Sequence, residues 1–157
     1  MTKRTRKTLT LICTAFVLLF LWETGWEWLR NNVLFKEVKG FSFFGYENYL
    51  ERTVAGRFLF GVIVAPLWEE ALFRYAPLHF AKNLGKKFIW PVVIITSTWF
   101  GWMHANINDL YMIEQGVCGF VFAYVFIKSK YRYWSSVTLH ALWNFSVMFA
   151  MPYFTKS

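Results

Sequence analysis

Two adjacent carboxylates, Glu69 and Glu70, lie inside an apolar stretch of this sequence together with Arg74. An ionisable side chain at the centre of a helix in lipid costs about 2.5–3.5 kcal/mol, so several of them in one segment need an explanation. Glu70 and Arg74 are four residues apart and can pair along one helical face. Glu69 points about 100° away from Glu70 around the axis and lacks that partner. A structural ion pair therefore explains Glu70 but not Glu69.

Three further polar residues interrupt apolar segments, namely His104, His140 and Asn144. His140 and Asn144 are four residues apart, so both face the same neighbour. Taken alone, this pair is also typical of an interhelical hydrogen bond worth about 0.6 kcal/mol. Together with Glu69, however, two imidazoles and an amide donor are sufficient to activate a water molecule and to stabilise an oxyanion.

The segments that must position these groups are strongly apolar. Of the 157 residues, 57% are hydrophobic and 22% aromatic, whereas soluble domains have about 45–50% apolar residues. A soluble globule this small cannot bury so much apolar surface. The net charge of +8 comes from basic residues that flank the apolar segments, which indicates contact with anionic lipid rather than nucleic acid. Cys13 and Cys118 lie within apolar segments and are expected to act as small hydrophobic side chains rather than to form a disulfide or bind a metal.

The predicted fold is an all-α, polytopic transmembrane helix bundle with about five spans. Each span is long enough to cross most of a hydrocarbon core about 30 Å thick. Residues 1–53 are expected to form an N-terminal transmembrane helix and an interfacial loop, and residues 54–157 a four-helix core. No small-x-small cleavage site follows the first span, which favours a retained helix over a signal peptide. The spans are expected at Leu9–Trp28, Val54–Phe80, Phe88–His104, Leu110–Ile127 and Trp134–Phe154.

Charge in the short loops predicts a cytoplasmic N-terminus, in a membrane that we expect to be the bacterial inner (plasma) membrane. Lys and Arg gather at the N-terminus and in segments 82–87 and 128–132, whereas the loop 105–109 has none. The long loop before the second span is an exception, since it carries Arg30, Lys36, Lys39, Arg52 and Arg57, but charges in long loops count for less. Counting helical rise from these loops places Glu69 near mid-depth, His104 near the outer leaflet and His140 towards the cytoplasm. Helix tilt is needed to bring the three together.

Three motifs, one on each of three predicted spans, resemble the signature motifs of the CPBP family. They are Glu69-Glu70-x-x-x-Arg74, Phe100-x-x-x-His104 and His140-x-x-x-Asn144. The family comprises the CAAX-processing and bacteriocin-processing (Abi) glutamic-type intramembrane proteases and includes the Ras-converting CAAX endopeptidase. The resemblance covers about Val54 to Phe149. Tyr75 departs from the family pattern, in which a glycine often follows the arginine.

The resemblance implies an intramembrane endopeptidase that uses no cofactor. Glu69 would be the general base, and His104 would hold and polarise the attacking water. His140 and Asn144 would donate hydrogen bonds to the tetrahedral oxyanion. The implied substrate is a membrane-associated protein or lipidated peptide, with a prenylated CAAX-type tail, a leader peptide or a C-terminal sorting signal as the alternatives.

Glu70 and Arg74 would support these groups by orienting the site and balancing its charge. A zinc-dependent version of the same protease uses the same residues, because one Glu and two His form a zinc-ligand set with a fourth position open for water. The resemblance favours the metal-free version. Two other classes compete with the enzyme: a transporter or proton relay, and a non-enzymatic membrane partner such as a bacteriocin-immunity protein.

Overall fold

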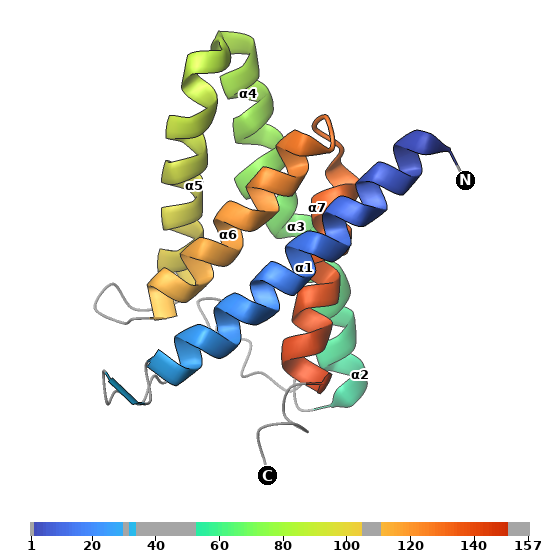
Figure 1. Ribbon diagram of the computed structural model, residues 1–157, viewed down its shortest axis with the longest axis vertical. Helices are drawn as coiled ribbons and strands as arrows, with labels where there is room; N and C mark the ends of the chain where they lie inside the picture. Colours follow the sequence, from blue (N-terminus) through green and yellow to red (C-terminus); the bar gives the residue numbers. More distant parts are fainter. Residues whose placement is uncertain (1, 30–31, 34–52, 105–110, 151–157) are drawn as a thin grey trace.

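All regular secondary structure in the described residues is helical, which confirms the all-α class. The computed structural model describes residues 2–29, 32–33, 53–104 and 111–150. In Figure 1, the long helix α1 (Lys3–Leu29) passes across α6 (Tyr111–Lys128) and α7 (Tyr133–Phe145), and α5 (Ile89–His104) stands beside α6. The helices therefore form one bundle.

The second predicted span is a continuous helical path in which two π-helical segments alternate with three α-helical ones. It consists of α2 (Val54–Arg57), the π-helix η2 (Phe58–Val64), α3 (Ala65–Glu70), the π-helix η3 (Ala71–Tyr75) and α4 (Ala76–Leu84). The path ends four residues after the predicted end because Gly85, with φ of 127°, adopts a conformation that other residues rarely reach. A short 3-10 turn, η4 (Lys86–Phe88), then leads into α5.

The remaining predicted boundaries lie within a few residues of those observed. Helix α1 begins six residues early, at Lys3, and so includes the basic N-terminal cluster. The last helix begins at Tyr133 and continues through the π-helix η5 (Ser146–Ala150). The predicted end of that span at residue 154, the predicted start of the fourth span at residue 110 and most of the interfacial loop lie outside the described residues.

One helix in the described part of the chain, α1, is long and apolar enough to cross a membrane on its own. Helices α5 and α7 contain 16 and 13 residues, and π-helical segments divide the Val54–Leu84 path. The prediction of about five spans therefore stays a prediction for these other segments.

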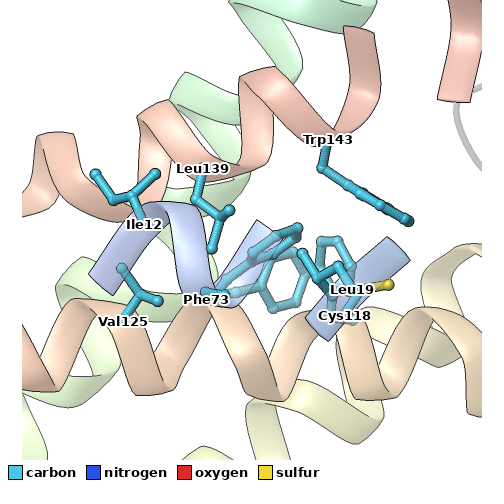
Figure 2. Close-up of a cluster of buried hydrophobic side chains, with 10 residues drawn as sticks. Ile12, Leu19, Phe73, Cys118, Val125, Leu139 and Trp143 are labelled. Atoms are coloured by element: carbon cyan, nitrogen blue, oxygen red, sulfur yellow. The ribbon is translucent and has the colours of Figure 1, made fainter. Parts of the chain in front are cut away.

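The hydrophobic core lies where α1 crosses α6 and α7 (Figure 2). Helix α1 falls outside the predicted 54–157 core, yet it contributes buried side chains to this cluster. Cys118 is buried and Cys13 is exposed, and both are free thiols. The cluster comprises Ile12, Ala15, Leu19, Phe73, Phe100, Cys118, Phe122, Val125, Leu139 and Trp143.

Helices α5 and α6 approach each other closely at Gly101. A Cβ atom at this position would lie 2.8 Å from the Gly116 backbone nitrogen and would also collide with the Met112 carbonyl. Only a glycine permits this separation of the two backbones. The close contact holds the C-terminal end of α5, and therefore His104, against the first turns of α6.

Candidate active site

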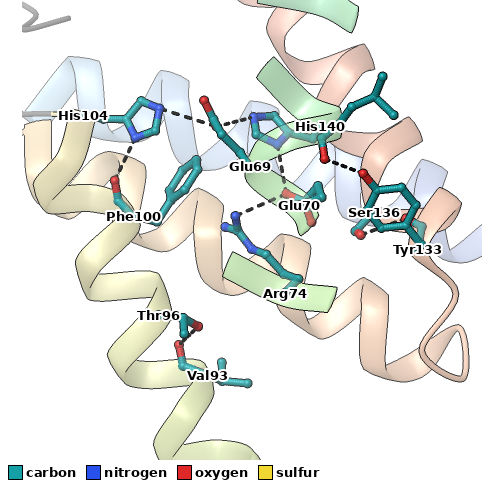
Figure 3. Close-up of polar contacts among 11 residues, drawn as sticks. Glu69, Glu70, Arg74, Val93, Thr96, Phe100, His104, Tyr133, Ser136 and His140 are labelled. Atoms are coloured by element: carbon teal, nitrogen blue, oxygen red, sulfur yellow. Dashed lines mark hydrogen bonds and ion pairs between the residues drawn. The ribbon is translucent and has the colours of Figure 1, made fainter. Parts of the chain in front are cut away.

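Glu69 lies between two histidines that come from different helices (Figure 3). Its Oε2 atom is 3.6 Å from His104 Nε2 and 3.6 Å from His140 Nε2. Glu69 is the second-last residue of α3, His104 ends α5, and His140 lies in the middle of α7. The structure thus brings together three groups that counting from the loops placed at different depths.

Glu70 points about 100° away from Glu69 around the same helix turn and contacts the other ring nitrogen of His140. The His140 Nδ1–H donates to Glu70 Oε1 at 2.9 Å. Arg74 NH1 lies 3.3 Å from the same carboxylate oxygen, so the predicted i,i+4 pair forms. Both side chains are almost fully buried, with relative exposures of 0% and 1%. The buried Glu70 carboxylate, which Arg74 also contacts, therefore fixes the orientation of the His140 ring.

The Arg74 guanidinium is enclosed by aromatic rings. Its central carbon lies 4.3 Å from the Phe100 ring centroid and 5.4 Å from that of Phe122. Cation–π contacts of this kind stabilise a desolvated guanidinium. Gly119 makes room for it, since a Cβ atom there would lie 2.8 Å from Arg74 NH2 and 3.2 Å from a Phe100 ring carbon.

Both catalytic histidine candidates also rest on phenylalanine rings. The Phe122 ring is stacked on His140 with centroids 4.4 Å apart and planes at 20°. The Phe100 ring lies 4.3 Å from His104, whose Nδ1–H donates to the Phe100 carbonyl at 2.8 Å. These contacts fix the orientation of each imidazole and aim each Nε2 atom at Glu69.

The side chain of Asn144 donates a hydrogen bond to a backbone carbonyl that Pro66 leaves without its helical partner. Ahead of Pro66, the helix is in π register, and the Ala65 N–H bonds to the Phe60 carbonyl five residues back. The equivalent acceptor for residue 66 is the Gly61 carbonyl, but proline has no N–H. The Asn144 Nδ2–H donates to that carbonyl at 2.8 Å instead. Asn144 thus anchors α7 to the helix that carries Glu69.

Sequence reasoning missed two kinds of residue in the site. The first comprises two residues of α6, Gly119 and Phe122, which contact Arg74 and His140 but match no motif. The second is Tyr133, whose hydroxyl donates to the Leu67 carbonyl just before the two glutamates. A glycine three residues before a phenylalanine in an apolar helix is too common a pattern to attract attention.

Exposure falls steadily from one side of the cluster to the other. The His104 side chain is 32% exposed and Glu69 10%, whereas Glu70, Arg74, Phe100 and Phe122 have almost no exposed surface. The Glu69 Oε2 atom that faces both imidazoles is itself buried and lies beyond hydrogen-bond distance of either one. A carboxylate close to two imidazoles, with a buried ion pair beside it, supplies the groups that a hydrolytic site requires.

The comparisons with known proteins agree with this class. The sequence profile of the type II CAAX prenyl endopeptidase Rce1-like family matches residues 51–146, more than half of the chain, and the match includes every residue of the site. The chain belongs to this family, whose members are integral membrane proteases, and the expected CPBP membership is confirmed. No match was found among curated proteins or among solved structures.

Proposed function

We propose that this protein is an intramembrane endopeptidase in which Glu69 activates the water molecule that hydrolyses a peptide bond of a membrane-associated substrate. The observation that carries the proposal is the position of one carboxylate oxygen 3.6 Å from the Nε2 atoms of both His104 and His140. Family membership supports the class of reaction, since it implies a protease. The glutamic-type mechanism is our inference from the geometry.

The helices beyond α1 are proposed to span or enter the bilayer with it. Each of them exposes large apolar side chains, among them Leu59, Ile94, Trp99 and Leu142. In water such surfaces would be costly, whereas lipid tails accept them. We infer a polytopic protein of about five spans in the bacterial plasma membrane, with the N-terminus in the cytoplasm because its basic cluster favours that side.

The hydrogen bonds of the two histidines determine what their Nε2 atoms can do. A carbonyl only accepts, so His104 Nδ1 must carry a proton that it donates to Phe100. When the ring is neutral, Nε2 is then a hydrogen-bond acceptor. A water molecule between Glu69 and His104 donates one hydrogen to the carboxylate and the other to Nε2. This arrangement leaves the lone pairs of its oxygen free to attack.

The proposed reaction needs only water and the residues of the site. The water oxygen attacks the carbonyl carbon while Glu69 takes one of its protons, and the carbonyl oxygen becomes an oxyanion. Glu69 then passes the proton to the leaving nitrogen as the C–N bond breaks. A general base of this kind contributes about 10²–10⁴-fold to the rate.

The oxyanion is proposed to be stabilised by His140 and Asn144. Ionised Glu69 and Glu70 together with Arg74 carry one net negative charge, which is costly in a buried site. A proton held on His140, which contacts both carboxylates, offsets this charge and gives Nε2 a hydrogen to donate. The Asn144 amide has two N–H groups, and the one not used by Gly61 can donate as well.

A zinc-dependent version of the same protease is the second candidate. It is favoured by the hydrogen bonds of both Nδ1 atoms, because histidine ligands of zinc characteristically donate their other N–H to a carboxylate or a backbone carbonyl. Glu69, His104 and His140 would hold the ion, which would lower the pKa of a bound water. In the described residues these side chains are not arranged as a ready-made metal site, so they would have to move towards the ion. Stoichiometric zinc in the purified protein, with activity lost on chelation and restored by zinc, would establish this version.

The test compares membrane proteins by mass spectrometry in cells that produce the wild type or Glu69→Gln. The substitution removes the base but keeps the size of the side chain, so we expect cleavage products to disappear while the amount of the variant stays unchanged. Cleavage that persists with Glu69→Gln would contradict the proposal. His79→Gln is the matched control, because His79 lies on the same helical path but outside the site.

A further inference from the structure

Ser97, in the middle of α5, has a buried hydroxyl group without a hydrogen-bond partner. Its relative exposure is 5%, and among the described residues it is the only hydroxyl whose oxygen is both buried and unpartnered. The preceding residue, Thr96, behaves differently, since its hydroxyl donates to the Val92 and Val93 carbonyls at 2.9 and 3.4 Å (Figure 3). Hydroxyls inside helices commonly make such bonds. The Ser97 oxygen therefore needs a partner from another helix.

The Arg74 guanidinium lacks acceptors in the same way. The Phe100 and Phe122 rings lie over the group, but its N–H donors point outward in its own plane and need oxygen atoms there. Glu70 supplies one such atom, 3.3 Å from NH1. Apart from this ion pair, the buried Nε, NH1 and NH2 atoms have no hydrogen-bond partner in the described structure. Buried charged donors are costly to leave unpaired, so Arg74 needs a further acceptor.

The packing around Gly119 shows that Ser97 and Arg74 border the same space. A Cβ atom at Gly119 would lie 2.8 Å from Arg74 NH2 and 3.4 Å from Ser97 Cα. Phe100, three residues further along α5, is the residue whose ring centroid lies 4.3 Å from the guanidinium carbon. This face of α5 is thus directed at Arg74. The hydroxyl oxygen of Ser97 is two bonds from its Cα atom, so it can reach towards NH2.

We propose that Ser97 is a positioning residue of the site, and that its hydroxyl oxygen accepts a hydrogen bond from Arg74, directly or through one water molecule. This inference rests on the proposed function. Arg74 NH1 lies 3.3 Å from the Glu70 oxygen that accepts the His140 Nδ1–H at 2.9 Å. By holding the guanidinium in place, Ser97 keeps the Glu70 carboxylate where it orients the His140 ring.

Proton exchange of the arginine side chains tests this bond without any substrate. Protein with ¹⁵N-labelled arginine is compared by NMR in detergent, and the Arg74 signals are identified by their loss in Arg74→Lys. We expect the guanidinium protons of Arg74 to exchange with water about tenfold faster or more in Ser97→Ala than in the wild type. Ser97→Thr keeps a hydroxyl and should retain the wild-type rate.

Thr96→Val is the matched control, because it removes a buried hydroxyl that already has partners within α5. It should leave the exchange of the Arg74 protons unchanged. An unchanged exchange rate in Ser97→Ala would overturn the inference. Equal acceleration in Ser97→Ala and Thr96→Val would assign the effect to the packing of α5 and would overturn it as well.

Cleavage kinetics separate this inference from the proposed function. Purified variants cleave a peptide that spans a mapped cleavage site, with Glu69→Gln as the reference for loss of the base. We expect kcat to fall about tenfold in Ser97→Ala with an unchanged KM, and to be restored in Ser97→Thr. An unchanged kcat in Ser97→Ala would overturn the positioning role but keep the protease. Equal cleavage by the wild type and Glu69→Gln would overturn the proposed mechanism, while the exchange rates still decide whether Ser97 binds Arg74.

Discussion

Two histidines in this protein share the same local structure but have different surroundings. His79 and His104 each follow an aromatic residue by four positions. The Nδ1–H of His79 donates to the Tyr75 carbonyl at 2.9 Å, and that of His104 donates to the Phe100 carbonyl at 2.8 Å. The distances between ring centroids are also alike, at 4.5 Å for Tyr75 and His79 and 4.3 Å for Phe100 and His104. The aromatic-x-x-x-His pattern therefore fixes the imidazole in the same way twice.

The difference comes from the helices packed against each ring. The His79 ring contacts Phe126 and Tyr131 at centroid distances of 5.7 and 5.6 Å. The His104 Nε2 atom instead faces Glu69. The same local motif thus orients the histidine ring in both places. Only at His104 does another helix place a carboxylate next to the ring, so only this imidazole can take part in proton transfer.

The largest effect on stability is expected where buried charges depend on each other. Glu70→Gln leaves Arg74 buried without its counter-ion, and removal of one partner of such a pair costs about 3–5 kcal/mol of unfolding free energy. Lys82→Met is the matched control, since Lys82 is exposed in the His79 region above the Tyr131 ring. Thermal unfolding in detergent should show a much lower midpoint for Glu70→Gln alone. Equal midpoints would show that the buried pair does not hold the site together.

Substitution of each histidine by glutamine tests whether the surroundings of the two rings determine their roles. His104→Gln should lower the cleavage rate about 10²-fold or more, because the attacking water loses a positioning group. His79→Gln should stay within about twofold of the wild type, since its ring contacts only aromatic neighbours and the backbone in the described structure. Rates are measured at equal protein amounts in the membrane. A similar loss for both variants would mean that the surroundings do not distinguish the two rings.

Two glycines of α6 offer a matched test of how Arg74 is accommodated. Gly119→Ala places a methyl group 2.8 Å from Arg74 NH2 and should cost about 1–3 kcal/mol by overpacking. Gly116→Ala brings its methyl group no closer than 3.5 Å to the Ser97 carbonyl, so we expect little loss. Chemical denaturation of both variants in detergent checks the difference. A destabilised Gly116→Ala beside an unchanged Gly119→Ala would contradict this packing.

The smallest effect concerns the ring stacked on His140. Phe122→Leu keeps an apolar side chain but removes an aromatic contact worth about 0.5–1.5 kcal/mol. We expect a cleavage rate reduced by about threefold to tenfold with an unchanged KM, because His140 would be less well oriented. Phe126→Leu, on the same helix beside His79, should leave the rate unchanged. A change in KM alone would indicate a role in substrate binding instead.

The helices were predictable because long apolar stretches bounded by charges allow few other structures. The ion pair of Glu70 and Arg74 was predictable as well, since residues four apart share a helical face. The register changes around Pro66 were not, because π-helical turns have no simple sequence pattern. The meeting of His104, Glu69 and His140 depends on how the helices pack, and counting of residues along separate helices cannot reveal it.

The contribution of α6 to the site was also beyond prediction. Phe122 is one of 18 phenylalanines in the chain, and nothing in its local sequence distinguishes it. Its role follows from the contact of α6 with both α5 and α7, which places this ring against His140. Residues that act through a neighbouring side chain become visible only when the packing is known.

The most direct test of the account is the rate at which purified protein cleaves a peptide spanning a mapped cleavage site. The account predicts that Glu69→Gln lowers this rate by about 10²–10⁴-fold, while the thermal midpoint and the helical circular dichroism signal match those of the wild type. His79→Gln should cleave at the wild-type rate in the same assay. A Glu69→Gln protein that cleaves within tenfold of the wild type would contradict the assignment of Glu69 as the base.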